Sequence, residues 1–144
     1  MTKSSRREQS LREELVNAFS HGIGLVAMLA GAPILLIAAS KRDGWAIVSA
    51  AVFAASVALL YFSSTVYHGS RPGRLKSAFQ TIDHAAIFLL IAGTYTPFTL
   101  GVLRGPWGWT LFGMIWFLAA IGIVNEVVGW RFAGRVSMVL YLGM

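Results

Sequence analysis

The sequence predicts an all-α protein, a polytopic bundle of transmembrane helices. Of its 144 residues, 56% are hydrophobic and only 12% are charged, whereas globular domains have about 25% charged residues. Four apolar runs are each long enough to cross a bilayer, which takes about 20 residues. The segments between them are short and charged. We therefore expect most of this chain to be surrounded by lipid.

Four full spans are predicted, and a fifth begins near the end of the sequence. The fifth apolar run starts at Val136 and has nine residues, which rise only about 13 Å as a helix, less than half the hydrocarbon core. We therefore expect residues 18–144 to be an incomplete transmembrane domain, the N-terminal part of a longer protein. The four full spans are Ala18–Ser40, Trp45–Tyr67, Ile82–Leu103 and Trp107–Val128.

The first 17 residues form a polar leader ahead of the first span. Leu11, Leu15 and Phe19 are spaced to share one face of a helix. This spacing predicts that residues 1–17 are a cytoplasmic leader containing an amphipathic helix on the membrane surface.

Composition also limits the partners and the kinds of site. The chain has no cysteine, which excludes disulfides and thiolate metal sites. Its net charge of +6 comes from basic residues that flank apolar segments, as in positive loops of membrane proteins, so nucleic acid is not an expected partner. Membrane lipids are the expected partners, and homo-oligomerisation stays open.

The distribution of Lys and Arg predicts the orientation. If the N-terminus is cytoplasmic, nine basic residues lie inside and three outside, which is a clear positive-inside bias. The three outside are Lys41, Arg42 and Arg104; the nine inside are Lys3, Arg6, Arg7, Arg12, Arg71, Arg74, Lys76, Arg131 and Arg135.

This orientation gathers polar residues at the cytoplasmic ends of the spans. Such groups are costly in lipid and usually face a bundle interior or a wet cavity, where they have a function. The opposite ends have no such collection, so we expect one polar site that opens to the cytoplasm. The residues concerned are Glu14, Asn17, His21, Ser63, Ser64, Tyr67, His68, Asp83, His84, Asn125 and Glu126.

Ser64 and His68 are four residues apart and share one face of the second span. A neutral imidazole there can bind a metal, with the hydroxyl as its hydrogen-bonded neighbour. Alternatively, His68 only caps the helix at the level of the lipid headgroups. Both interpretations stay open.

Asp83 is predicted to start the third span, a short loop after His68. Its carboxylate can orient a metal-bound water or act as a general base. The alternative is an acid stabilised by the positive end of a helix that Thr81 caps. His84 is rotated by about 100° from Asp83 on a helix, so at most one of them faces the site. We favour Asp83, because lipid rejects a carboxylate more strongly than an imidazole.

Glu14, Asn17 and His21 lie along one stripe of the first helix. They either line the same cavity or form an interfacial network of helix caps, and the spacing favours the caps. A hydrolytic triad of Ser64, His68 and Asp83 is disfavoured. Its nucleophile would lie in mid-helix, without the sharp turn that exposes such a serine.

Three motifs in order, "EELVNAFSHGIG", "SSTVYHGS" and "DHAAIFLLIAGTYTPF", resemble the hemolysin III family. This family is the bacterial branch of the progestin and adipoQ receptor superfamily, which includes the adiponectin receptors. The resemblance covers residues 13–144. It implies a seven-helix protein of the bacterial inner (plasma) membrane with a cytoplasmic N-terminus.

The resemblance also implies a zinc site near the cytoplasmic side. Its Ser-x-x-x-His motif matches Ser64 to His68, which makes His68 a metal ligand, and its aspartate matches Asp83, which approaches the metal-bound water. Two further ligands come from a His-x-x-x-His motif in the seventh helix, which this chain lacks. Zinc is thus expected in the complete protein, with two ligands missing here.

Two classes of function stay open. One is a zinc-dependent membrane hydrolase acting on an amide or ester bond of a lipid, with Asp83 and Ser64 as the catalytic candidates. The other is a non-enzymatic protein, either a pore-forming haemolysin that lyses foreign cells or a protein of membrane homeostasis and sensing. Only the first requires His68 and Asp83.

Overall fold

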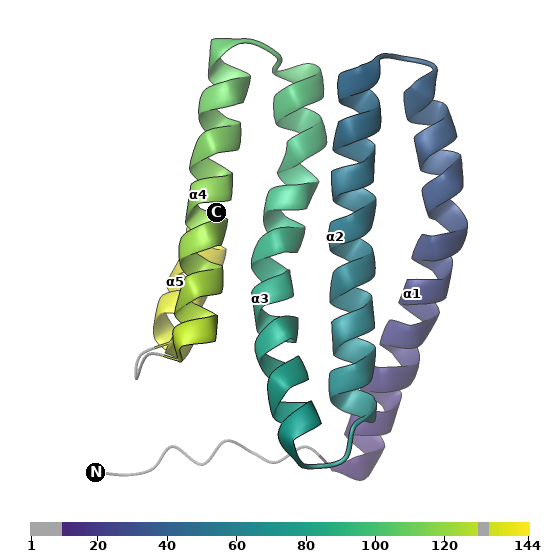
Figure 1. Cartoon of the computed structure of the whole chain (residues 1–144), viewed down its shortest axis with the longest axis vertical. Helices are drawn as coiled ribbons and strands as arrows, with labels where there is room; N and C mark the ends of the chain where they lie inside the picture. The colour runs from purple at the N-terminus through teal and green to yellow at the C-terminus, as the bar shows by residue number, and fades with distance from the viewer. Residues whose placement is uncertain (1–9, 130–132) are drawn as a thin grey trace.

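A computed structural model describes residues 10–129 and 133–144, with side chains for all of them except 133–135. These residues form five α-helices and one π-helical segment (Figure 1). They are α1 (Leu11–Ser40), α2 (Gly44–Gly69), α3 (Arg74–Pro97), η1 (Phe98–Val102), α4 (Pro106–Val128) and α5 (Ala133–Gly143). No strand occurs in the described ranges, so the all-α prediction is confirmed.

Four helices are long and apolar enough to cross a membrane: α1, α2, α3 continued by η1, and α4. They stand in a row in chain order, and each packs mainly against the next (Figure 1). Only 6% of the apolar window of α1 is buried, against 44% for α3 and η1. The third span is therefore the centre of the bundle, and α1 lies at its edge.

Helix α1 begins before the predicted first span. Ser10 is its N-cap: the Ser10 hydroxyl accepts from the Glu13 backbone N–H, and the Glu13 carboxylate accepts from the Ser10 N–H at 2.7 Å. This capping box satisfies two backbone donors at the helix start. The described part of the polar leader is therefore continuous with the first span and is not a separate surface helix.

The alternative in which Thr81 caps the third helix is wrong. Helix α3 starts at Arg74, after Gly73 with a positive φ of 156° that favours glycine. Thr81 lies inside the helix, where its hydroxyl donates to the Ser77 carbonyl at 3.4 Å. The same correction applies to Asp83: it lies well within α3 and does not start it, so the helix dipole no longer accounts for its position.

The packed core lies between α3, α4 and α5. Phe88, Ala92, Ile115 and Ala119 are buried there. Gly122 allows the close approach, because a Cβ at this position would lie 2.3 Å from the Phe88 ring. Many large apolar side chains elsewhere are exposed, as expected of surfaces that face lipid.

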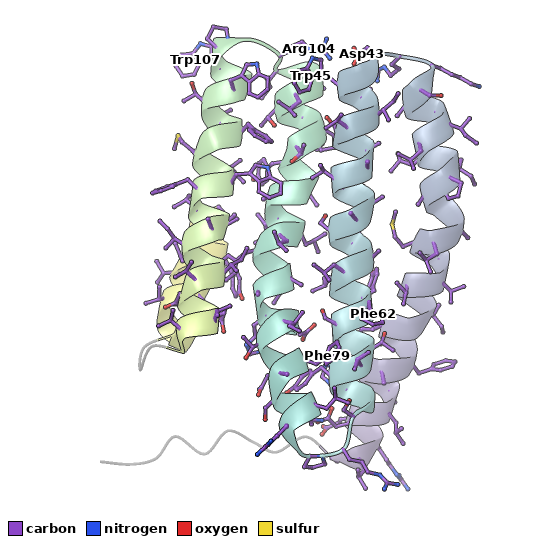
Figure 2. The ribbon with its side chains drawn as sticks, in the orientation of Figure 1. Asp43, Trp45, Phe62, Phe79, Arg104 and Trp107 are labelled. Atoms are coloured by element: carbon purple, nitrogen blue, oxygen red, sulfur yellow. The ribbon has the colours of Figure 1, made fainter. Side chains whose placement is uncertain are left out.

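The two ends of the bundle differ in their side chains. Figure 2 shows Asp43, Trp45, Arg104 and Trp107 at the end with the α1–α2 and α3–α4 connections, and Phe62 and Phe79 toward the other end. That other end holds the α2–α3 turn and the start of α1 (Figure 1). It is where the sequence predicts the polar site.

Candidate functional site

His68 forms a hydrogen bond with the first helix. Its Nδ1 atom lies 2.8 Å from Glu14 Oε2, and the two side chains are only 11% and 17% exposed. An ionised carboxylate can only accept a hydrogen bond, so Nδ1 has the proton. In the neutral ring, Nε2 then has the free lone pair. Glu14 therefore sets the tautomer that leaves Nε2 able to bind a metal or accept a proton.

Lys76 connects this pair to the third helix. Its Nζ atom donates to Glu14 Oε1 at 2.8 Å and lies 4.9 Å from the centre of the Tyr67 ring. The two oxygens of Glu14 thus bind residues of two other helices, His68 of α2 and Lys76 of α3. These two hydrogen bonds offset the free-energy cost of removing the partly buried Glu14 carboxylate from water.

His21 stacks on His68. The two ring centroids are 5.8 Å apart and the planes are tilted by only 4°, while Tyr61 lies 5.9 Å from His21. We call Glu14, His21, His68 and Lys76 the His68 cluster. Two members of the predicted α1 stripe, Glu14 and His21, therefore meet at one histidine of α2.

Asp83 contacts a different residue of α2. Its Oδ1 lies 3.5 Å from the Ser63 hydroxyl, which also donates to the Leu60 carbonyl at 3.0 Å. Ser63 is fully buried, and Asp83 is 9% exposed. The carboxylate therefore lies at the α2–α3 interface and not in lipid. Ser63 is one of the polar residues predicted at this end, but its contact with Asp83 was not predicted, because sequence alone does not show which of two adjacent serines faces α3.

Ser64 is also buried, at 3% exposure. In the part of the chain whose side chains are described, no hydrogen bond or ion pair joins Ser64, His68 and Asp83 to one another. The roles of Ser64 and Asp83 in catalysis and of His68 in metal binding stay predictions.

A second set of polar contacts lies between α3, α4 and α5. His84 Nδ1 is 3.5 Å from Glu126 Oε2, and the Ser137 hydroxyl donates to Glu126 Oε1. Asn125 Nδ2 donates to Ser137 at 3.1 Å, and the Tyr141 hydroxyl donates to the His84 carbonyl at 3.1 Å. His84 thus contacts α4 and α5 while Asp83 contacts α2. Sequence reasoning missed Ser137 and Tyr141, whose signal is their spacing of four in an apolar run.

The described residues fit one ligand of a zinc site but not a complete set. A histidine whose second nitrogen donates to a carboxylate is the usual arrangement of a metal-binding imidazole, and His68 with Glu14 has it. Within residues 10–129 and 136–144, no three His, Asp or Glu side chains are grouped closely enough to hold a metal ion. A catalytic zinc usually has three protein ligands.

Comparison with known proteins identifies the family. The family model described as "Haemolysin-III related" matches residues 9–144. The chain belongs to the haemolysin-III family. It is 43% identical to "Hemolysin-3" of Bacillus cereus over 143 residues, 99% of this chain. It is 44% identical to "Hemolysin-3 homolog" of Bacillus subtilis (strain 168) over 119 residues, 82% of this chain.

These haemolysin-III relatives are longer than the chain. The matched regions are 65% of the Bacillus cereus protein and 56% of the Bacillus subtilis protein. No solved structure matches the chain. Family membership and four apolar helices make it a multi-pass membrane protein.

Proposed function

We propose that this haemolysin-III chain provides the His68 half of a zinc site in a membrane hydrolase that cleaves a lipid amide or ester bond. The observation that supports the proposal best is the 2.8 Å contact between Glu14 Oε2 and His68 Nδ1. It leaves His68 Nε2 as the free nitrogen of a partly buried ring. The remaining ligands lie outside the described residues, in keeping with the greater length of the relatives.

The residues of this chain have separate roles in that proposal. Bound zinc would supply a polarised carbonyl and a water of lowered pKa. Glu14 fixes the His68 ring and its proton at Nδ1, and Lys76 holds Glu14 in place. Asp83, held near Ser63, accepts a proton at a carboxylate oxygen. Ser64 is buried next to Ser63 on α2 and is the second catalytic candidate in this proposal.

We also propose that the N-terminus faces the cytoplasm of a bacterial cell and that the spans cross its inner membrane. The nine-to-three distribution of Lys and Arg supports this orientation. The His68 cluster then lies at the cytoplasmic side, where a water-soluble product can leave.

Zinc content of the purified full-length protein tests the hydrolase proposal. We expect His68→Ala to reduce bound zinc at least tenfold, because loss of even a residue that only supports a ligand costs 10- to 100-fold in affinity. His84→Ala is the matched control, since His84 contacts Glu126 and not the His68 cluster. Equal zinc in the wild-type protein and in His68→Ala would remove His68 from the ligand set.

The alternative is a non-enzymatic role in cytolysis or in membrane homeostasis and sensing. Its support is the name "Hemolysin-3" of the Bacillus cereus relative. Lysis of erythrocytes by cells expressing wild-type protein, His68→Ala or Asp83→Ala separates the two. A hydrolase loses activity in both variants. Lysis that persists at wild-type level in both favours the non-enzymatic role.

A further inference from the structure

A second candidate site lies at the end of the bundle opposite the His68 cluster. A cavity of about 580 Å³ opens there between the end of α1, the start of α2 and the end of α3 with η1. Figure 2 shows Asp43 and Arg104 of its rim at this end. Ligand pockets in proteins usually measure about 300–1,000 Å³, so the space is large enough for part of a small amphiphile.

The inner wall of this cavity is apolar. Apart from Ser49, whose hydroxyl donates to the Trp45 carbonyl at 2.7 Å, the uncharged residues that line it are apolar, among them Ala38, Ala46, Ala50, Phe53 and Pro97. Ala50 is buried in the packing of α2, so the wall is part of the bundle and does not depend on a loop. Such a surface favours a hydrocarbon chain over a water-soluble solute.

The rim, by contrast, has charged residues. Both Nη2 contacts of Arg104 go to Asp43, at 3.1 and 2.9 Å, and Arg104 Nε donates to the Leu100 carbonyl at 3.1 Å. Asp43 also accepts from the Ala46 backbone N–H at 2.9 Å as the N-cap of α2. The charges of Asp43 and Arg104 therefore offset each other.

Arg42 is the third charged residue of the rim. In the part of the chain that the structure describes, its side chain has no ion pair or hydrogen bond. One guanidinium at the mouth of the cavity is thus not compensated by an acid. Guanidinium groups bind phosphate through charge-assisted, often bidentate hydrogen bonds.

We propose that this cavity binds one anionic phospholipid from the leaflet that contains the α1–α2 connection, with an acyl chain along the apolar wall and the phosphate on Arg42. The position of the site at the end of three spans places it at headgroup depth. A zwitterionic lipid presents a cation as well as a phosphate to the positive rim, so it binds more weakly. The site is distinct from the His68 cluster, and the proposal does not depend on zinc.

Retention of lipid by the purified full-length protein tests whether the charge of Arg42 selects an anionic lipid. The protein is mixed in detergent with equal amounts of dioleoyl phosphatidylglycerol and dioleoyl phosphatidylcholine, and bound lipid is counted by native mass spectrometry. We expect preference for phosphatidylglycerol to fall about fivefold in Arg42→Gln, the effect of one basic residue near an anionic surface. Lys41→Gln is the control, because Lys41 has the same charge but does not line the cavity.

A second variant tests the cavity itself. Gly101 lines it, and a Cβ there meets no atom within 4 Å, so Gly101→Leu fills the space without displacing the backbone. We expect it to lose both lipids. Gly113→Leu is its control, since Gly113 in α4 is equally open but lies outside the cavity.

Four results would overturn the proposal. The first is unchanged lipid preference in Arg42→Gln, and the second is full lipid retention in Gly101→Leu. The third is displacement of phosphatidylglycerol by an equal concentration of soluble glycerol phosphate, which would make the ligand a free anion. Absence of any bound lipid in the wild-type protein, as when another segment of a longer chain fills the cavity, also contradicts it.

Discussion

Glu14 of α1 connects three helices through its side chain. Its two carboxylate oxygens bind His68 of α2 and Lys76 of α3, each at 2.8 Å. A carboxylate with two such partners holds both of them in position. If it were truncated, the partly buried Lys76 ammonium would lose the acid with which it pairs. The orientation of His68 is therefore set by a residue 54 positions earlier in the chain.

We predict that Glu14→Gln weakens zinc binding by about tenfold or more, since an amide cannot hold the protonated Nδ1 of His68 as strongly as a carboxylate. The measurement is a zinc competition titration with a chelator, made on full-length protein. Glu13→Gln is the control, because a glutamine still completes the Ser10 capping box. Equal zinc affinity of the two variants would show that Glu14 does not orient a ligand.

Asp43 leads to a prediction about acid stability. The Ala46 backbone N–H, and next to it Arg104, hold the pKa of Asp43 below its usual value of 3.8. Because the pKa is lower in the folded state, the stabilisation is complete above pH 3.8 and is lost as the pH falls through the folded value.

We therefore expect Asp43→Asn to melt at a lower temperature than wild type at pH 6, and this difference to shrink below pH 4. Thermal melting in detergent across that pH range is the measurement. A temperature difference that is independent of pH would contradict the assignment of the effect to this carboxylate.

Among the elements, the contacts between neighbouring helices depend on small residues. Gly93 of α3 meets Ser56 of α2, and Gly122 of α4 meets the Phe88 ring of α3; a Cβ at either glycine would lie less than 2.5 Å from its neighbour. Small residues at such positions let helix backbones approach closely in lipid, where packing replaces the hydrophobic effect as the main attraction.

We predict that Gly122→Ala destabilises the bundle by about 1–3 kcal/mol, the usual effect of overpacking a core. Gly113→Ala in the same helix should be neutral or slightly stabilising, because its Cβ meets open space and alanine favours the helix. Unfolding in detergent by heat compares the two. The packing argument fails if both variants melt at the same temperature.

The spans could be predicted from the sequence, but the starts of α1 and α3 could not. Hydropathy marks the residues that cross lipid, and all four predicted spans lie largely within observed helices. The starts at Leu11 and Arg74 depend on local hydrogen bonding at Ser10 and on the backbone conformation of Gly73. Neither feature changes hydropathy, so both helices begin earlier than predicted.

The residues of the candidate site could be predicted from the sequence, but their partners could not. His68 and Asp83 stand out because ionisable groups are rare beside apolar runs. Their partners Glu14 and Ser63 come from other helices. Which side chain faces which neighbour depends on how two helices are rotated and staggered against each other. Spacing along a single helix does not contain that information, which is why Ser64 was chosen as the catalytic candidate although Ser63 is the serine that contacts Asp83.

The whole molecule has two chemically different ends. The contacts of His68 with Glu14 and of His84 with Glu126 lie toward one end, and the Asp43–Arg104 ion pair lies at the other. The proposed orientation places the first of these ends in the cytoplasm, which makes the α1–α2 connection external and the α2–α3 turn internal.

Single cysteines test this orientation, because the natural sequence has none. We expect Lys41→Cys to react with a membrane-impermeant maleimide added to intact cells, and Arg71→Cys to react only after the cells are broken. Both residues are exposed in the structure, so neither cysteine is covered by the protein. The reverse labelling pattern would invert the topology.

The length of α1 has a consequence for how the protein responds to its membrane. At 1.5 Å per residue its 30 residues span about 45 Å, roughly 15 Å more than a typical hydrocarbon core. A helix longer than the bilayer is thick adapts to thinning by tilting. Since α1 packs at the edge of the bundle, tilting displaces its first turn further than its middle. We therefore expect a thinner membrane to change the distance between Glu14 and His68.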